Sequence, residues 1–573
     1  MNQPNPAIVA QSAVRRLPRV ALWLFCLAYV LPGFIGREPW KRADMTAFGY
    51  MVELARGNTS WFSPQMMGLP PQVDALVPYW LGAWVMALAP HWIAPDFAAR
   101  APFALLLALS LIATWYGTYH LARSPKAQPV AFAFGGEANA PDYARAIADG
   151  GLLAFIACLG LAQLSHETTP AATQLCFTAL SFYAIAAMPY SRVAPGIAGI
   201  VGLAGLTLSG APALAVLFGA GSAAIHLLDG YADAPGTPAR TTWHAIRAWG
   251  IALLTISVAL LATIFDLWRW RIELPEPTWA EGRSIGRLLL WFTWPAWPLA
   301  LWTLWRWRLQ LLKGSMSRHL ALPLWFVTVA LGATLLTASA DRSLLLALPA
   351  LAALAAFALP TLSRSVAALM DWFTLLFFSG CGIIIWVVWI AMQTGIPEQP
   401  AANVARLAPG FEPSFSVTSF FIAIAATLAW AWLVKWRVGR HQAAIWKSLV
   451  LPAGGAALSW LLLMTLWLPL LDFARSYAPL VQRVSAILAQ PACVESHGLD
   501  RGQIAAFQFH AHLNLRPAGR IAACPWMLVD KDAINTLANS VDLNQWTLHS
   551  TFNRPSDRDE DVLLYRRATA SAP

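Results

Sequence analysis

The sequence predicts an all-α polytopic membrane protein that ends in a small soluble α/β domain. Of its 573 residues, 58% are hydrophobic and only 12% are charged, whereas a typical soluble protein has about 25% charged residues. Apolar segments long enough to cross a bilayer recur through the first part of the chain, and cations gather in the short loops between them. Beyond Leu471 the chain becomes polar and shows alternating patterns.

The first hydrophobic segment sets the topology. The basic stretch Arg15–Arg19 precedes Val20–Ile35, and no small-residue cleavage site follows, so we expect a retained first helix that begins in the cytoplasm. The next segment, Gly36–Gly57, then lies outside. Apolar residues spaced i, i+3, i+4 after Asp44 predict a helix that lies flat on the membrane surface.

Windows of ~20 apolar residues give roughly thirteen crossings. They are Val20–Ile35, Arg100–Leu121, Gly150–Leu164, Ala171–Met188, Val193–Leu208, Ala211–Leu228, Trp249–Ile264, Leu288–Trp305, Leu320–Leu336, Leu344–Leu359, Val366–Met392, Ser416–Leu433 and Leu449–Leu470. Leu76–Trp92 is bracketed by Pro78 and Pro90 and is only marginally long enough to span a bilayer. We therefore expect it to form an interfacial or re-entrant helix. Ser124–Asp149 is expected to be a polar loop. This arrangement places every cation-rich short loop in the cytoplasm.

The predicted domains are a transmembrane domain, 1–470, with its first outer loop at 36–99, and an outer soluble domain, 471–573. Within the soluble domain, the runs Ile504–Leu515, Trp526–Asp530, Trp546–Phe552 and Val562–Tyr565 read as strands. Cys493 and Cys524 lie in this polar part and could form a disulfide if it faces an oxidising compartment.

Composition also excludes several classes of function. The net charge of +10 comes from topology-setting loops, and no pattern for base stacking or groove reading is present, so no nucleic-acid partner is expected. No Cys or His spacing suits a metal site, so we predict no metal-ligating residues. The sequence indicates no cofactor and leaves dependence on a divalent metal open.

The leading candidate for chemistry is Asp44, which follows Arg37, Lys41 and Arg42 in the first outer segment. Sugar transfer from a phosphate-linked donor needs a base for the acceptor and cations for the departing phosphate. One carboxylate beside three cations supplies both. Alternatively, Asp44 caps a helix N-terminus and the cations anchor the first transmembrane helix.

Two further candidates lie at helix ends on the same side of the membrane. His166 and Glu167 connect two apolar segments and would assist or position Asp44, although a simple turn before Pro170 fits as well. Arg342 at another outer boundary has the forked geometry that binds a phosphate. It would alternatively be a snorkelling anchor.

The order of these motifs resembles the GT-C glycosyltransferases, integral membrane enzymes that use polyprenyl-phosphate sugars. The chain is most similar to the bacterial aminoarabinose transferases acting on lipid A and to the protein O-mannosyltransferases. The residues that carry the resemblance are Asp44, the helix ending Glu53–Gly57, Trp61, Pro64, Gly68-Leu69, Pro78–Leu81, Ala99–Pro102, and Asp341-Arg342 followed by Leu348–Leu354.

The resemblance implies an inverting, metal-independent transfer at the outer face. It places Asp44 at the family's first acidic catalytic position, Glu167 near the second, and Arg342 where a donor-phosphate contact is expected. The sequence departs from the family in two places. Met45 follows Asp44 where an acidic residue is common, and Val73–Ala75 replaces an acidic residue and Lys-Pro. Lys41, Arg42 or Arg342 would then take over the role of the missing lysine.

The sequence therefore predicts a hexosyl- or pentosyltransferase in the cell inner membrane, with its site and C-terminal domain in the periplasm. Its expected partners are a polyprenyl-phosphate sugar donor, membrane lipid, and an envelope lipid, glycan or protein acceptor. The alternatives are a lipid or glycolipid transporter or flippase, and a non-catalytic envelope assembly protein. A transporter would favour ionisable residues in mid-membrane and internal repeats.

Overall fold

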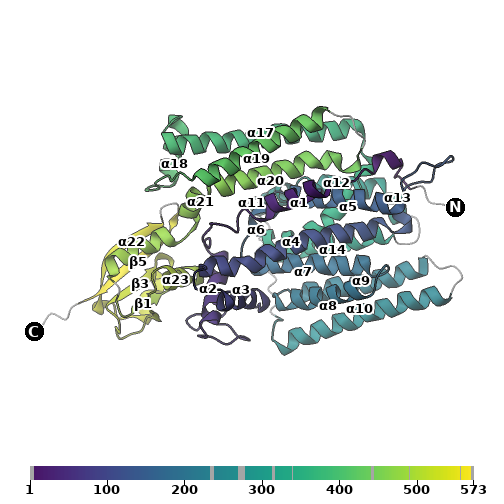
Figure 1. Ribbon diagram of the computed structural model, residues 1–573. Helices are drawn as coiled ribbons and strands as arrows, with labels where there is room; N and C mark the ends of the chain where they lie inside the picture. The colour runs from purple at the N-terminus through teal and green to yellow at the C-terminus, as the bar shows by residue number, and fades with distance from the viewer. Residues whose placement is uncertain are drawn as a thin grey trace, which may run out of the picture.

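The computed structural model describes residues 5–232, 238–268, 278–312, 317–337, 340–439, 444–489, 491–554 and 557–568. Its helices run mostly along one direction and form a stack, with a small sheet at one end (Figure 1). The described helices of the membrane part are α1 (Arg19–Val30), α2 (Ala43–Ala55), α3 (Val77–Leu88), α4 (Pro95–Ala122), α5 (Ala140–Ala157), α6 (Leu161–Leu164), α7 (Pro170–Ala187), α8 (Val193–Leu208), α9 (Pro212–Ala232), α10 (Pro238–Ile264), α11 (Trp279–Phe292), α12 (Ala296–Arg306), α13 (Arg308–Leu312), α14 (Arg318–Leu336), α15 (Ala340–Leu345), α16 (Leu348–Ala356), α17 (Arg364–Thr394), α18 (Glu398–Leu407), α19 (Val417–Gly439), α20 (Val450–Leu466) and α21 (Leu468–Arg475).

Seven helical segments in the described ranges are long and apolar enough to cross a membrane, so the chain is a multi-pass membrane protein. They are α4, α7, α14, α17, Ala245–Ile264 of α10, Val417–Arg437 of α19, and Ile445–Leu466, which includes α20. The other expected crossings correspond to shorter or broken helices, such as α1 and α8. The total of thirteen crossings therefore stays a prediction.

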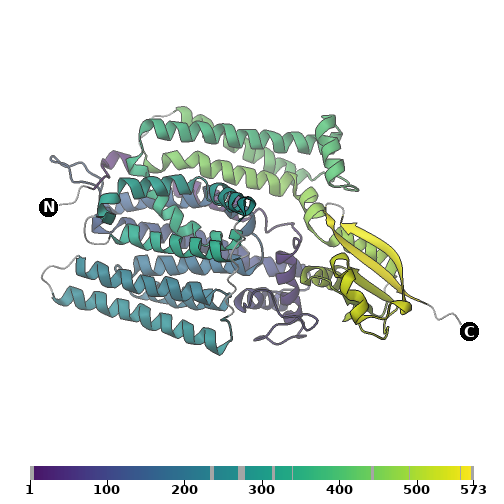
Figure 2. The same cartoon turned by 180° about the vertical axis from the view of Figure 1, so that it is seen from behind.

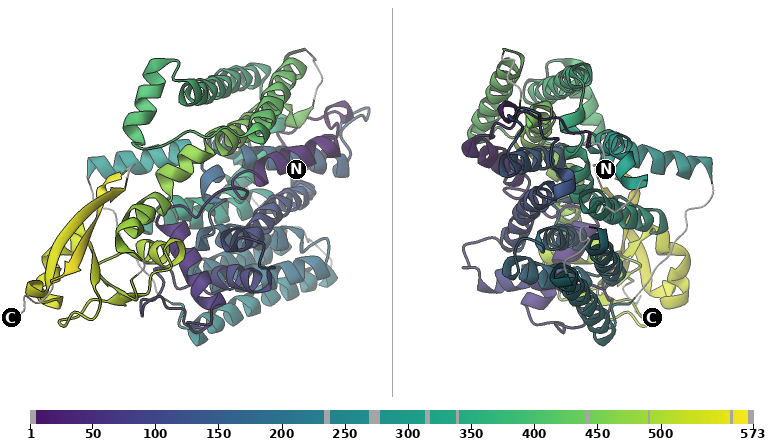
Figure 3. Two further views of the ribbon diagram at one scale, coloured as in Figure 1. Left: turned by 60° about the vertical axis from the view of Figure 1, so that its left-hand side comes forward. Right: turned by 90° about the vertical axis from the view of Figure 1, so that its right-hand side faces the viewer.

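The bundle has layers. Helices α4, α5, α7 and α16 pack together in the centre, while α8, α9 and α10 cover one side of it (Figures 1 and 2). On the opposite side, α17, α19 and α20 share an apolar cluster that includes Phe378, Trp430 and Leu462. The pair α17 and α19, joined by α18, lies at the periphery of the molecule (Figure 3).

Two local predictions for the membrane part were wrong. The segment 124–149 is not wholly a loop, because α5 already begins at Ala140, where Pro141 occupies the first turn that tolerates its missing N–H. The expected crossing Leu288–Trp305 is broken into α11 and α12. The break falls at Thr293–Pro295, where proline removes a helical hydrogen-bond donor.

The C-terminal region contains α22 (Ala478–Leu488), α23 (Arg501–His510), α24 (Ile534–Ser540) and the strands β1 (Val494–His497), β2 (Leu515–Pro517), β3 (Trp526–Asp530), β4 (Trp546–Arg554) and β5 (Asp557–Arg567). The strand order is β2-β1-β3-β5-β4, parallel between β1 and its neighbours and antiparallel on the β3-β5-β4 side. The expected strand Ile504–Leu515 is mostly helix α23, because Asp500 and Gln503 form a capping box that starts a helix.

Helix α2 is the helix predicted to lie flat on the membrane surface, and this placement stays a prediction. It packs between α3 and α23, and most of its side chains are buried. Phe48 meets Phe509 of α23 edge to face, with ring centroids 4.7 Å apart. A Cβ on Gly49 would lie 2.5 Å from the Cβ of Ala505, so glycine allows the two helices to approach this closely. Helix α2 is thus packed against the C-terminal region.

Cys493 and Cys524 form a disulfide between β1 and the segment that leads into β3. The other four cysteines are free. We predict that the denatured, unreduced protein takes up four maleimide-polyethylene glycol groups and the reduced protein takes up six, measured as gel shifts. A Cys493→Ser/Cys524→Ser variant is the control and should take up four in both states. Six additions without reductant would contradict the pairing.

Candidate active site

A buried ion pair links the first outer segment to the start of α2. Arg37 Nη2 lies 2.9 Å from Asp44 Oδ2, and each side chain is only 1% exposed. The same Nη2 donates to the His166 carbonyl at 2.9 Å, and the guanidinium stacks on the Trp40 ring at 4.5 Å. Gly33 lies in the turn between α1 and Arg37 and has φ +94°, a conformation that favours glycine. A Cβ at this position would also lie 2.6 Å from Trp460.

Asp44 accepts four hydrogen bonds. Oδ1 accepts from the backbone N–H and the hydroxyl of Thr168, at 2.7 and 2.6 Å. Oδ2 accepts from Arg37 and from the backbone N–H of Trp40, at 2.9 and 3.0 Å. These four donors match the roughly four lone-pair sites of a carboxylate. Asp44 is the second residue of α2 and does not cap it; the N-cap is Arg42, at φ +58°.

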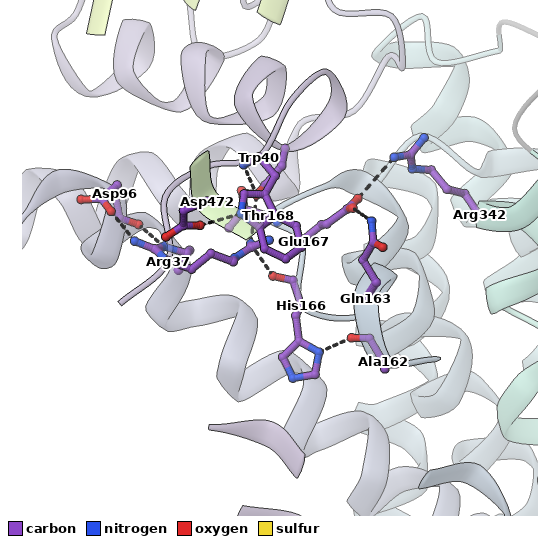
Figure 4. A network of polar contacts seen from close by, with 12 residues as sticks. Arg37, Trp40, Asp96, Ala162, Gln163, His166, Glu167, Thr168, Arg342 and Asp472 are labelled. Carbon is purple, nitrogen blue, oxygen red and sulfur yellow. Dashed lines mark hydrogen bonds and ion pairs between the residues drawn. The ribbon is translucent and has the colours of Figure 1, made fainter. Parts of the chain in front are cut away.

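Glu167 lies beside this pair but points elsewhere, toward Arg342 and Gln163 (Figure 4). Its Oε2 lies 3.3 Å from Arg342 Nη2, and its Oε1 accepts from Gln163 Nε2 at 3.1 Å. Burial, and then the charge of Asp44, raise the pKa of Glu167, and Arg342 opposes the shift. Arg342 is a third exposed, and its Nε is buried without a hydrogen-bond partner.

The imidazole of His166 turns away from the two carboxylates (Figure 4). Its Nδ1 contacts the Ala162 carbonyl and its Nε2 the Tyr29 carbonyl, and the ring packs against Phe34 and Trp460. Burial lowers the pKa of His166 to about 4, so the ring is neutral at pH 7. Only the backbone carbonyl of His166 reaches the network, where it holds Arg37.

Lys41 and Arg42 turn toward the C-terminal region. Arg42 Nε lies 3.2 Å from Glu560 of β5, and Lys41 Nζ lies 4.0 Å from the same carboxylate. Arg554 of β4 also pairs with Glu560, at 3.2 Å. Of the predicted site residues, the structure therefore brings together Arg37, Asp44, Glu167 and Arg342. It does not bring in the His166 ring, Lys41 or Arg42.

Residues near the last transmembrane helix were missed by sequence reasoning. Trp40 donates its indole N–H to Asp472 of α21 at 2.7 Å. The guanidinium of Arg475, also on α21, lies 5.1 Å from the centre of the Trp40 ring. Burial raises the pKa of Asp472 to about 7. The available signal was position, because both charges lie just beyond an apolar segment, as Asp341 and Arg342 do.

Two further contributors come from the turn before α7 and from the start of α4. Thr168 supplies two of the four donors to Asp44, and the ion pair between Asp96 and Arg100 opens α4 next to Arg37 (Figure 4). No composition signal marks a threonine as a partner of a distant aspartate. In the described part of the chain, no three His, Cys, Asp or Glu side chains cluster in a way that could hold a metal ion.

Comparison with solved structures identifies this arrangement of helices. Two crystal structures of ArnT from Cupriavidus metallidurans match the chain along nearly its whole length. The apo structure aligns with a TM-score of 0.54 at 14% identity and covers 97% of this chain and 98% of ArnT. The chain has the ArnT fold. The structure of ArnT bound to undecaprenyl phosphate gives a TM-score of 0.56 at 13% identity, over 97% and 100% of the two chains.

The resemblance to GT-C enzymes seen in the sequence is thus confirmed at the level of the fold, since ArnT is of that type. No protein-family model matches the chain, and no curated protein matches it in sequence. At this identity the two ArnT structures show the fold alone, so activity has to be argued from the site.

The raised pKa of Glu167 predicts how a substitution changes stability. Above its folded-state pKa, the folded protein holds Glu167 charged at a cost of about 1.4 kcal/mol for each unit of upward shift. Glu167→Gln should therefore raise the melting temperature at pH 8. The gain should shrink as the pH falls through that pKa, where wild-type Glu167 takes up its proton. Thermal unfolding from pH 5 to 8 measures this.

The matched control is Glu398→Gln, which replaces an exposed carboxylate on α18 and should change stability little at any pH. A loss of stability in Glu167→Gln at pH 8 would contradict the prediction. It would mean that the contacts of Glu167 with Arg342 and Gln163 outweigh its burial and its repulsion by Asp44.

Proposed function

We propose that this chain is a membrane glycosyltransferase that moves a sugar, with inversion, from a polyprenyl-phosphate donor to an envelope acceptor at the outer face. The observation that carries the proposal is the match to ArnT over 97% of the chain, together with the undecaprenyl phosphate bound in one ArnT structure. The disulfide in the C-terminal region supports a location of that region in an oxidising compartment, the periplasm.

The contacts of the two carboxylates suggest a division of roles. Asp44 has its lone pairs occupied and lies almost entirely buried, so it is suited to holding Arg37 and the turn at Thr168 in place. Among the described residues, Glu167 has two polar partners, and its raised pKa gives it a stronger affinity for a proton once it is ionised. We assign the general base to Glu167, with Asp44 as its positioning partner.

The donor phosphate would bind on the arginines beside Glu167. Arg342 has a third of its side chain exposed and a spare Nε–H, and Arg475 adds a second guanidinium near the same end of the bundle. Guanidinium groups bind phosphate oxygens through charge-assisted hydrogen bonds and stabilise the leaving phosphate. Lys41 and Arg42 are set aside for this role, because they turn toward Glu560 of the C-terminal region and not toward Glu167.

A transporter remains the second candidate, because polar groups at helix ends also suit a gated lipid path. The partly buried Asp371–Arg437 pair lies on α17 and α19 rather than in this network. Lipid flipping by the protein in vesicles, without any sugar transfer, would favour this alternative.

The deciding experiment is sugar transfer by the purified protein with a panel of polyprenyl-phosphate sugars and envelope acceptors. We expect turnover by the wild type and a drop of ~10²–10⁴ in kcat for Glu167→Gln, the usual loss when a general base is removed. The drop should occur although this variant keeps or gains thermal stability. Parallel reactions with a chelator test dependence on a divalent metal.

Asp44→Asn is the companion variant. It leaves Arg37 as an uncompensated buried charge, so it should lose turnover together with about 3–5 kcal/mol of stability. An Asp44→Asn protein that melts like the wild type and yet is inactive would instead make Asp44 the base. Full activity in Glu167→Gln would overturn the assignment of Glu167.

Arg342→Gln tests the phosphate contact. Losing a charged hydrogen bond of about 1.5–3 kcal/mol should raise the KM for the donor by roughly 10- to 150-fold, with a smaller effect on the KM for the acceptor. The control is Arg364→Gln, an exposed arginine at the start of α17. Equal changes in both KM values would speak against a donor-specific contact.

A further inference from the structure

A cavity lies between α1, α4 and α5, at the end of the bundle away from the carboxylate network. Its volume is about 510 Å³. Helix α1 has twelve residues and so rises about 18 Å from Arg19 to Val30, near the turn that leads to Arg37. The cavity includes Arg19, at the start of this rise, so its basic end is well separated from the candidate active site.

The lining of the cavity is apolar on one side and basic at its end. Leu22 and Cys26 of α1 and Leu111 and Ile112 of α4 form part of the apolar wall. Among the described lining residues, three arginines (Arg16, Arg19 and Arg145) face a single carboxylate, Asp149. The lining thus carries an excess of two positive charges.

The charged groups of the lining are not equally engaged. Asp149 is buried and accepts from the Trp115 indole at 2.9 Å and from the Leu17 backbone N–H at 3.5 Å. Arg16 pairs with Asp142 at 3.2 Å, outside the lining. For Arg19 and Arg145, in contrast, the described contacts include no ion pair and no side-chain hydrogen bond. Two guanidinium groups at the cavity are therefore available to an anion.

Aromatic rings give the basic end a rigid wall. Trp115 is fixed by Asp149 and stacks on Tyr119, with centroids 5.4 Å apart and planes 5° from parallel. Tyr116 meets the same indole edge to face at 4.8 Å. Trp and Tyr rings prefer the level of lipid headgroups in a membrane, so this wall lies where a headgroup would lie.

An apolar surface continues from the cavity along α1. Val20, Trp23, Leu24 and Leu27 are all exposed on this helix, whereas Arg19 is its first residue and Arg16 precedes it. A molecule that matches both parts has an anionic head at the arginines and hydrocarbon chains along α1 and α4.

We propose that this cavity binds an anionic glycerophospholipid, with its phosphate on Arg19 and Arg145 and its acyl chains against α1 and α4. Basic pockets between transmembrane helices bind such headgroups in other proteins. A glycosyl donor is a poorer match, because a donor whose phosphate lies at Arg342 cannot also place it at the far end of α1.

The test is native mass spectrometry of the delipidated, full-length protein with phosphatidylglycerol or phosphatidylcholine of the same acyl chains. We expect clear preference for phosphatidylglycerol. At about 1 kcal/mol for each arginine, Arg19→Gln/Arg145→Gln should weaken its binding about thirtyfold and remove the preference. Arg56→Gln, which changes an exposed arginine at the end of α2, is the matched control and should bind like the wild type.

A second variant fills the cavity without changing its charge. Ala108→Phe should weaken the binding of both lipids, and its melting temperature checks that the protein is folded. Glycerol phosphate alone should bind far more weakly than the lipid, because the chains contribute. Equal binding of the two lipids, unchanged phosphatidylglycerol binding in the double-arginine variant, or displacement of phosphatidylglycerol by equimolar polyprenyl phosphate would each overturn the proposal.

Discussion

The ion pair between Arg37 and Asp44 is the contact on which the outer end of the molecule depends. Both side chains are almost fully buried, and an unpaired charge at such a depth would cost several kcal/mol. Every remaining lone pair of Asp44 has a donor, and Arg37 is also held by the His166 carbonyl and the Trp40 ring. The pair thereby joins the turn after α1, the start of α2 and the turn before α7.

The same network leaves a neighbouring carboxylate in an unfavourable setting. Glu167 is buried close to the negative charge of Asp44 and has one partly exposed arginine as its counter-ion. A fold optimised only for stability would have an uncharged residue there. Costly groups of this kind often mark functional sites, which supports the choice of Glu167 as the residue that handles a proton.

Much of the architecture could be predicted from local patterns. Helix α8 and strand β3 have the residue bounds that the sequence suggested, because apolar runs and their polar or glycine boundaries act locally. The early start of α5 and the helix α23, which the sequence analysis did not predict, carried readable signals in Pro141 and in the Asp500–Gln503 capping box. At α23 the capping box outweighs the alternating apolar pattern that predicted a strand.

The candidate site was predictable only in part, since its contacts are between distant residues. Asp44, Glu167 and Arg342 stand out as charges at the ends of apolar segments. The sequence around Arg42 does not indicate that its partner is Glu560, which lies 518 residues later. Likewise, the orientation of His166 is set by packing against Phe34, in the turn after α1, and Trp460, on α20. Side-chain direction of this kind needs the tertiary structure.

The contacts between the first outer segment and the end of the chain have a consequence for biogenesis. Trp40 binds Asp472, 432 residues later, the Lys41 backbone N–H binds the Arg475 carbonyl, and Arg42 binds Glu560 on the last strand. A ribosome releases these partners only after it has synthesised the membrane helices α1 to α20. The segment that contains Trp40, Lys41 and Arg42 therefore forms its final contacts only after the membrane helices have been synthesised. A chain truncated before β5 keeps the partners of Trp40 and Lys41 but lacks Glu560, so the segment after α1 would reach only part of its final contacts.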